Sequence, residues 1–366
     1  MDLLQALDGS SGRERGVTAS LRPVAGSPLQ VLDLLRPWVR DGGDPLVVRT
    51  SGSTGAPKDV VLSHRAVLAS ARASLDRLGG AGGWLSAMPV KGVGGLQVLV
   101  RSVLADLEPV FADDHHDLAS SVGAVVGSRR YASLVPTQLH RLLRDDAAEP
   151  LARLDAVLVG GASVPSDLMA AARRAGVTVV RTYGMSETCG GCVYDGVPLD
   201  GVRMRLDERG QVQIAGDVLF DGYVDADRTA AVLHDGWFST ADLGDIDGDG
   251  RLRITGRADE VVLSGGVNVS LPAVTQALRD IDEVGDAVAL GVPDAEWGSR
   301  VVAFVVPTDA VCLDALRLDV LRDEVESAGL PRTWAPREVV LLDVLPLLPG
   351  GKVDRQLLIE RVTRAR

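Results

Sequence analysis

Short apolar runs alternate with helix-forming stretches between about residue 44 and residue 240, and this alternation limits the folds that the chain can adopt. The runs LVVRT, ASLVP, AVLVG and VTVVRTYG are rich in β-branched residues and indicate strands, whereas HRAVLASARASLDRL has the spacing of an amphipathic helix. Strands and helices in alternation pack as layers around a sheet. The pattern therefore predicts an α/β fold with a large layered N-terminal domain and a largely parallel sheet.

The pattern changes after Ile214, where glycine and aspartate interrupt the apolar runs. In GDIDGDGRLRITGR, the DGDG cluster favours positive φ and indicates a hairpin turn. We expect a hinge near Arg257 to Glu260, because no low-complexity linker separates the two patterns. The predicted domains are residues 1–257 and a small α+β domain of residues 258–366, with a helix at 271–280, a strand at 300–306 and a helix at 313–327.

The charge balance limits the partners of the chain. The chain of 366 residues has 50 acidic and 38 basic side chains, which gives a net charge of -12. Such a chain is poorly suited to phosphate backbones or anionic membrane surfaces. We therefore expect small-molecule partners, no nucleic acid and no membrane, with any phosphate bound by a local site.

The sequence also predicts a cytoplasmic location. The start, MDLL, lacks the basic and apolar segments of a signal peptide, and the apolar stretch from Leu96 to Leu107 is interrupted by Arg101 and Asp106. Three cysteines are too few and odd in number for a disulfide framework, which agrees with a reducing compartment.

The segment TSGSTGAPK, which follows the strand LVVR, predicts a phosphate-binding loop. Its glycines let backbone N–H groups turn inward, its hydroxyls add donors and its lysine adds charge. It is not a Walker A loop, because Pro57 stands where the second glycine is required. On composition alone a flexible Ser/Gly surface loop is the alternative. The candidate ATP-binding residues here are Thr50, Ser51, Gly52, Ser53, Thr54, Gly55 and Lys58.

Five further segments follow this loop in a fixed order. They are GGA at 160–162, TYGMSET at 182–188, GWFSTAD at 236–242, GRAD at 256–259 and PGGKV at 349–353. Together the set resembles the adenylate-forming superfamily, which includes acyl-CoA synthetases, luciferases and the adenylation domains of peptide synthetases. The resemblance implies that family's fold, shortened at the N-terminus, with a mobile C-terminal domain, and it implies ATP and Mg²⁺ as cofactors with coenzyme A as co-substrate.

The resemblance also assigns nucleotide contacts. By that likeness Ser186 bonds the α-phosphate, Glu187 holds Mg²⁺, and Asp242 takes the ribose hydroxyls with Arg257 beside it. A carboxylate can accept hydrogen bonds from both ribose hydroxyls. Without the resemblance, Asp242 would be interpreted as a turn residue in an Asp-rich hairpin. The residues implied around adenine and the rest of AMP are Gly160, Gly161, Ala162, Tyr183 and Gly184.

Lys352 lies in a Pro/Gly-rich loop, where a solvated lysine is the ordinary interpretation. The resemblance implies instead that it bridges the acyl carboxylate and the α-phosphate during adenylation, so that Lys352, Ser186 and Glu187 are the catalytic set. A fixed cation there offsets the repulsion between two anions. Asp259 matches the family hinge, and Gly265 and Gly266 match the border of the pantetheine tunnel.

Three other motifs are weaker. Cys189 and Cys192 have redox or zinc spacing, but no second Cys/His pair lies nearby. The run that starts at Asp245 mimics an EF-hand loop, yet Gly256 stands where the bidentate glutamate belongs. The run DDHHD at 113–117 is typical of a solvated loop. We expect no metal site at any of them.

Within the superfamily, RTYGMSETCGGCVYDGVPLDGV and SGGVNVS resemble the o-succinylbenzoate–CoA ligases of menaquinone biosynthesis in their short bacterial form. The usual pocket histidine of the family would fall at Gly92, which puts that role in doubt here. Because the acid has a second carboxylate to recognise, we expect Lys91, or else Arg101, to bind it. The remaining acyl-site candidates are Thr182 and Met185.

Two alternatives stay open at this point. One is a stand-alone adenylating enzyme that passes another aryl or acyl acid to CoA, a carrier-protein thiol or an amine. The other is a non-catalytic nucleotide-binding relative, which would be expected to lack the catalytic lysine or the metal-binding glutamate, yet Lys352 and Glu187 are both present. The family also suggests a homodimer.

Overall fold

The computed structural model describes residues 21–50, 57–112, 117–144, 148–308, 316–347 and 353–364. Its largest sheet has seven strands in the order β10-β9-β8-β7-β6-β4-β5. The strands from β8 to β5 are parallel, and β9 and β10 add antiparallel pairs at one edge. The bounds are β4 Gly83–Ser86, β5 Val110–Phe111, β6 Arg130–Leu134, β7 Ala156–Val159, β8 Val179–Met185, β9 Gly190–Tyr194 and β10 Val197–Pro198.

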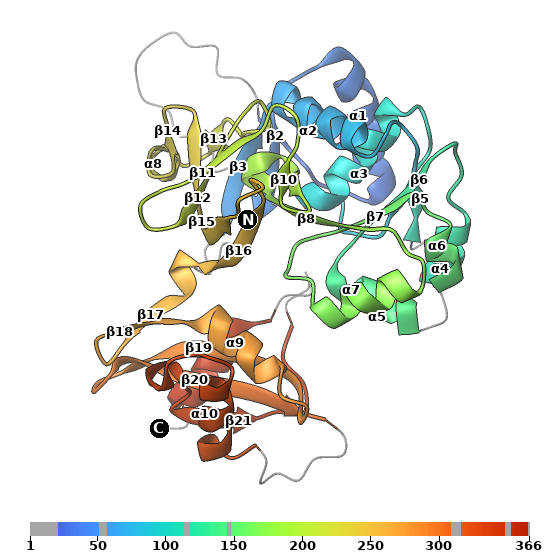
Figure 1. Ribbon diagram of the computed structural model, residues 1–366. Helices are drawn as coiled ribbons and strands as arrows, with labels where there is room; N and C mark the ends of the chain where they lie inside the picture. Colours follow the sequence, from blue (N-terminus) through green and yellow to red (C-terminus); the bar gives the residue numbers. More distant parts are fainter. Residues whose placement is uncertain are drawn as a thin grey trace.

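Helices cover both faces of this sheet (Figure 1). Alternate strand residues face opposite layers, as Trp84 and Leu85 do: Trp84 packs with helices α1 to α3, and Leu85 packs with α4 to α7. The predicted layered α/β domain is therefore confirmed. The helices are α1 Pro28–Asp41, α2 His64–Arg77, α3 Val93–Leu104, α4 Leu118–Gly123, α5 Pro136–Arg144, α6 Ala148–Ala152 and α7 Ser166–Arg174.

One strand prediction was wrong in its placement. The run LVVRT forms β2 (Leu46–Thr50), but β2 belongs to a separate sheet with the order β1-β2-β3-β13. It pairs antiparallel with β3 (Lys58–Leu62), because a connection this short closes a hairpin, whereas parallel neighbours need a crossover of a dozen residues or more. The outer strands are β1 Arg22–Pro23 and β13 Gly222–Tyr223.

The third sheet carries the predicted hairpin. Strands β15 (Trp237–Ile246) and β16 (Leu252–Arg257) pair antiparallel with Ile246 opposite Leu252, and Gly250 in the turn has φ of 77°. The DGDG prediction is confirmed. The other elements of this region are β11 Arg203–Leu206, β12 Gln211–Ala215, α8 Ala226–Ala230 and β14 Leu233–His234.

The C-terminal elements form a separate lobe, joined to the rest through the short 3₁₀-helix η4 (Ala258–Glu260) (Figure 1). A five-stranded sheet, with the order β18-β17-β20-β19 and β21 beside β20, has an apolar cluster on each face. The bounds are β17 Val261–Ser264, β18 Val267–Ser270, α9 Leu271–Arg279, β19 Val284–Asp294, β20 Gly298–Pro307, α10 Leu318–Ser327, η6 Arg332–Trp334, β21 Glu338–Leu341 and α11 Arg355–Arg364.

The sequence located the first helix and the strand of this lobe, since α9 and β20 cover residues 271–280 and 300–306 almost completely. It placed the start of the second helix too early. Arg317 has the extended backbone of an N-cap, with φ of -67° and ψ of 149°, so α10 begins at Leu318. Residues 309–315 lie outside the described ranges.

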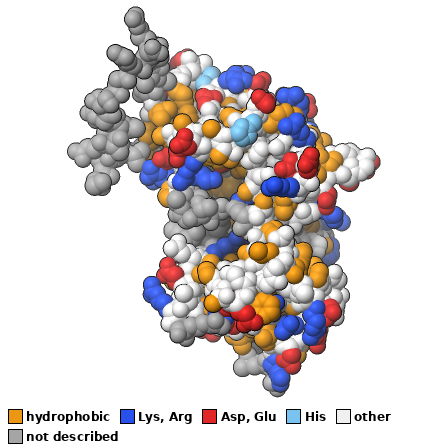
Figure 2. Space-filling view, turned by 90° about the vertical axis from the view of Figure 1, so that its left-hand side faces the viewer, with side chains coloured by type: hydrophobic (Ala, Val, Ile, Leu, Met, Phe, Trp, Pro, Cys, Tyr) orange, Lys and Arg blue, Asp and Glu red, His pale blue; other side chains and the backbone are white. Residues whose placement is uncertain are grey.

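Charged side chains of both signs are interspersed over the face seen in Figure 2, without a continuous basic stripe among the described atoms there. Within the described ranges, no helix combines the length and the apolar character needed to cross a bilayer.

Candidate active site

The turn between β8 and β9 builds the centre of the site. The short 3₁₀-helix η3 (Ser186–Thr188) buries Ser186 and Glu187, and Cys189 closes it with a left-handed φ of 50°. The two strands approach so closely that a Cβ on Gly184 would lie 2.1 Å from the Gly190 carbonyl oxygen. The close approach of β8 and β9 therefore requires glycine at position 184, independently of any contact with AMP.

Glu187 is 8% exposed, and its carboxylate is held by a residue that no motif indicated. The hydroxyl of Tyr223 donates to Glu187 Oε1 at 2.6 Å, and the Phe220 N–H donates to the Glu187 carbonyl oxygen at 2.9 Å. Burial, with the nearby Glu187 carboxylate, holds the pKa of Tyr223 well above its ordinary value, so its hydroxyl stays a donor.

The ends of the phosphate loop lie beside this carboxylate. Thr50 closes β2 and pairs with Lys58, the first residue of β3. The Lys58 Nζ lies 5.4 Å from the centroid of the Tyr223 ring, within the range of a cation–π contact. Ser51, Gly52, Ser53, Thr54 and Gly55 lie outside the described residues.

The predicted ribose carboxylate is also held in place. Asp242 is buried on β15, where its Oδ2 accepts from the Tyr183 hydroxyl at 2.8 Å and its Oδ1 accepts from Arg257 Nη1 at 2.8 Å. Burial, followed by the Asp242 charge, raises the pKa of Tyr183, which therefore remains a donor. Each carboxylate oxygen keeps a lone pair for a ribose hydroxyl.

Gly160, Gly161 and Ala162 follow β7 at the carboxyl end of the parallel sheet. A Cβ on Gly160 would lie 2.2 Å from Thr182 Oγ1, and Gly161 has φ of 81°. Ligands of open α/β sheets bind outside the carboxyl ends of the strands, and β8 brings Thr182, Tyr183 and Met185 to the same edge.

The predicted tunnel glycines lie in the described part of the C-terminal lobe, whereas Lys352, the predicted catalytic lysine, lies outside it. Gly265 and Gly266, with φ of 59° and 81°, form the two-residue turn between β17 and β18. The backbone of Asp259 lies in η4, whereas nothing is described of its side chain or of Lys352.

The hinge region contains an ion-pair chain that the motifs did not reveal. Beyond its bond to Asp242, Arg257 has Nε 3.9 Å from a Glu260 oxygen, and the same oxygen pairs with Arg355 at the start of α11. The chain links the predicted ribose contact to the helix that follows the lysine loop. Only the spacing of charges around GRAD could have suggested it.

The two residues predicted to bind the second carboxylate of the acid have different environments. Lys91 is exposed, whereas Arg101 on α3 is 4% exposed. The Arg101 guanidinium donates to the Gln97 carbonyl oxygen at 3.0 Å and to the Ser74 hydroxyl at 2.9 Å, and it lies 3.9 Å from the centroid of the Trp84 ring. Within the described ranges, no carboxylate pairs with Arg101, and burial lowers its pKa.

The comparisons with known proteins agree with this geometry. Residues 40–223 match the model of the AMP-binding enzyme family, and residues 273–352 match that of the AMP-binding enzyme C-terminal domain. The chain belongs to the AMP-binding enzyme family. Its adenylate-forming fold, with a small C-terminal domain, follows from the same matches, and the resemblance drawn from the motifs is confirmed.

Several members of this family are similar to the chain over most of its length. The chain is 46% identical over 327 residues to a probable 2-succinylbenzoate–CoA ligase of Mycobacterium tuberculosis (strain ATCC 25618 / H37Rv), covering 86% of this chain and 84% of that protein. The solved o-succinylbenzoate CoA synthetase (MenE) from Bacillus subtilis with the acyl-adenylate intermediate OSB-AMP has 26% identity and a TM-score of 0.72, covering 86% and 68% of the two chains. The same enzyme with ATP and magnesium ion has 25% identity and a TM-score of 0.71, covering 85% and 69%.

The donor set fits the magnesium ion that the family implies. Mg²⁺ takes one or two carboxylates together with phosphate oxygens and waters, instead of an all-protein cage. Glu187 supplies one buried carboxylate of this kind, and among the described residues no group of three or more His, Cys, Asp or Glu side chains could hold a metal.

The structure describes most residues of the other three motifs. Cys189 and Cys192 are buried free thiols, and Asp247 and Gly250 form the β15–β16 turn. Residues 113–116 lie outside the described ranges, while Asp117 caps α4 through the Ser120 N–H.

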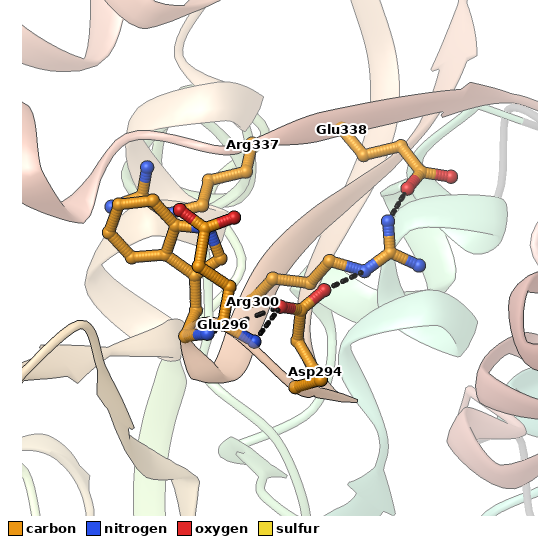
Figure 3. Close-up of a pocket in the computed structure, with 7 residues that line it drawn as sticks. Asp294, Glu296, Arg300, Arg337 and Glu338 are labelled. Atoms are coloured by element: carbon orange, nitrogen blue, oxygen red, sulfur yellow. Dashed lines mark hydrogen bonds and ion pairs between the residues drawn. The ribbon is translucent and has the colours of Figure 1, made fainter.

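A cavity of about 430 Å³ lies in the C-terminal lobe, lined by residues at the β19–β20 turn and the start of β21 (Figure 3). Arg300 pairs there with Asp294 and Glu338, and Arg337 stacks 3.3 Å from the centroid of the Trp297 ring. The Trp297 carbonyl oxygen accepts from the Gly265 N–H at 3.0 Å. This cluster therefore supports the turn of the predicted tunnel.

Proposed function

We propose that this chain is an ATP-dependent acid–CoA ligase that converts o-succinylbenzoate to o-succinylbenzoyl-CoA through an acyl-adenylate, as a step of menaquinone biosynthesis. Three features support the proposal: the family match, the relatives named for this activity, and the convergence of η3, β15 and the ends of the phosphate loop.

In the first half-reaction, an acid carboxylate oxygen forms a bond to the α-phosphorus of ATP, and pyrophosphate leaves. We assign Ser186 to the α-phosphate and Lys352 to the space between the two anions, where its charge stabilises the transition state. Asp242 and Tyr183 orient the nucleoside, and Arg257 fixes Asp242 from the other side. Glu187 would hold the Mg²⁺ ion, which would neutralise phosphate charge when bound.

In the second half-reaction, the CoA thiolate attacks the acyl carbon and AMP leaves. We propose that residues 258–366 rotate about Asp259 as one domain against residues 1–257, so that the turn at Gly265 and Gly266 borders the pantetheine. A turn without side chains suits close passage of a thin ligand.

The buried environment of Arg101 favours a dicarboxylic acid as the substrate. A buried guanidinium without a carboxylate partner is costly, and a ligand carboxylate would remove much of that cost. Gln97 lies one turn before Arg101 on α3 and packs against Gly190, three residues after Glu187. We propose that the second carboxylate of o-succinylbenzoate binds at Arg101.

The function is tested by assaying pyrophosphate release and CoA-thioester formation with o-succinylbenzoate, benzoate and a medium-chain fatty acid. We expect thioester from o-succinylbenzoate alone, and neither product in Lys352→Ala. Pyrophosphate without thioester would identify another acceptor, such as a carrier-protein thiol or an amine. No reaction with o-succinylbenzoate in the wild type would contradict the proposed substrate.

The finer partner and location assignments rest on the same reasoning. We propose a cytoplasmic homodimer that binds the acid, ATP and CoA and no nucleic acid, in agreement with the net charge of -12. Light scattering after size exclusion measures the oligomeric state, and a mass of one chain would contradict the dimer.

A further inference from the structure

Tyr223 lies between the two parts of the proposed triphosphate site. Its hydroxyl donates to Glu187 Oε1 at 2.6 Å, and its ring lies 5.4 Å below Lys58 Nζ, at the end of the phosphate loop. One side chain therefore contacts both the proposed metal carboxylate and the loop lysine.

The backbone and the neighbours of Tyr223 fix its side chain. β13 pairs Tyr223 with Val60 on β3, and the Tyr223 N–H donates to Thr229 Oγ1 at 2.8 Å. The Phe220 ring meets the Tyr223 ring edge-on, with 5.0 Å between the centroids. The direction of the hydroxyl is thus set by a strand pairing, by the hydrogen bond to Thr229 and by an aromatic contact.

The hydrogen bond occupies one of the two oxygens of Glu187. Among the described residues, Tyr223 is the donor to that carboxylate, and Glu187 Oε2 accepts no bond from them. A metal-binding carboxylate needs one oxygen for the ion or its water, while a bond on the other oxygen holds the rotamer.

We infer that Tyr223 is a positioning residue for the magnesium–ATP complex: its hydroxyl orients the Glu187 carboxylate so that Oε2 serves the metal, and its ring holds Lys58 beside the triphosphate. The inference rests on the proposed function through the use of Mg·ATP. Tyr223 contacts neither the acid nor CoA in this role, so its effect belongs to metal and nucleotide binding.

Tyr223→Phe separates the two contacts, because it keeps the ring beneath Lys58 and removes the hydroxyl. We expect the dissociation constant of Mn²⁺ for the enzyme bound to α,β-methylene-ATP, measured by electron paramagnetic resonance, to rise at least about tenfold. The matched control is Tyr131→Phe, which removes a hydroxyl that donates to the Leu78 and Gly80 carbonyl oxygens and not to Glu187. The control should bind Mn²⁺ like the wild type.

A role through Glu187 makes the effects non-additive. In a Glu187→Gln background, Tyr223→Phe should weaken Mn²⁺ binding no further. Wild-type affinity in Tyr223→Phe, or an equal loss in both backgrounds, would overturn the inference. Failure of the wild type itself to bind the metal with the nucleotide would instead contradict the proposed function.

If Tyr223→Phe does not fold, the wild type labelled with 3-fluorotyrosine supplies the test. The chain has four tyrosines, so its fluorine resonances can be assigned by replacing the other three in turn. Mn²⁺ with the nucleotide should broaden the Tyr223 signal and leave the Tyr131 signal sharp. A sharp Tyr223 signal at saturating Mn²⁺ would contradict the placement.

Discussion

At the residue scale, the site depends on neutral hydroxyls that hold charged carboxylates. Tyr223 holds Glu187 and Tyr183 holds Asp242, and in both pairs the pKa of the phenol is raised by burial first and by the carboxylate second. A donor that cannot ionise near neutral pH keeps each carboxylate oriented without adding charge. Both phenols therefore remain hydrogen-bond donors near neutral pH.

Cys189 and Cys192 give a pH-dependent prediction. Burial raises the pKa of Cys192 to about 12 and also raises that of Cys189, so both thiols stay protonated at pH 8. Because the thiolate is the reactive form, native Cys312→Ser protein should react negligibly with Ellman's reagent at pH 8, whereas the urea-unfolded protein should release two equivalents. Rapid reaction of either thiol in the native protein would support the redox interpretation that we set aside.

Sequence motifs identified the residues whose types carry the chemistry, as well as Tyr183 and Arg257, which hold Asp242. They missed Tyr223 and Glu260. Glu187, Asp242 and Arg257 stand in ordered motifs, and the structure holds the first two through the bonds Tyr223–Glu187 and Arg257–Asp242. Tyr223 and Glu260 act through tertiary contacts with residues distant in the chain or across the hinge. Such contacts leave no local spacing to detect.

At the element scale, the β8–β9 hairpin is the part of the site least tolerant of change. Gly184→Ala would place a methyl group 2.1 Å from a backbone oxygen, so we expect it to lower the unfolding free energy by about 1–3 kcal/mol or more. Gly248→Ala is the matched control, since no atom lies within 4 Å of its added carbon. Thermal unfolding should show a fall in Tm of several degrees for Gly184→Ala only, and equal Tm values for the two variants would contradict this packing.

The elements that sequence predicted well are those with strong local periodicity, such as α2, α9 and the β15–β16 hairpin. The placement of β2 was wrong, because an apolar run does not reveal which sheet it joins. The start of α10 was wrong, because the apolar pattern extends past the N-cap at Arg317. Pairing and capping depend on neighbours that the run itself does not contain.

At the scale of the whole molecule, the two lobes meet through η4, and the ion-pair chain Asp242–Arg257–Glu260–Arg355 follows the same path. Arg257 lies on the N-terminal side of the proposed hinge and Glu260 on the C-terminal side. A rotation about Asp259 would change their separation while leaving Glu260 with Arg355. The ion pair between Arg257 and Glu260 thus crosses the proposed domain boundary after residue 257.

The central claim is that the acid is a dicarboxylate recognised by a buried arginine, and substrate preference in Arg101→Met tests it most directly. The substrates are o-succinylbenzoate and its two monocarboxylate analogues, 4-oxo-4-phenylbutanoate and 2-butanoylbenzoate. We predict that kcat/KM for thioester formation from o-succinylbenzoate falls at least about thirtyfold, because the second carboxylate loses a buried partner. The kcat/KM for the monocarboxylate analogue that the wild type accepts should change much less. The Tm of Arg101→Met should equal that of the wild type. Equal losses for the dicarboxylate and the monocarboxylate, or no loss for either, would contradict the account.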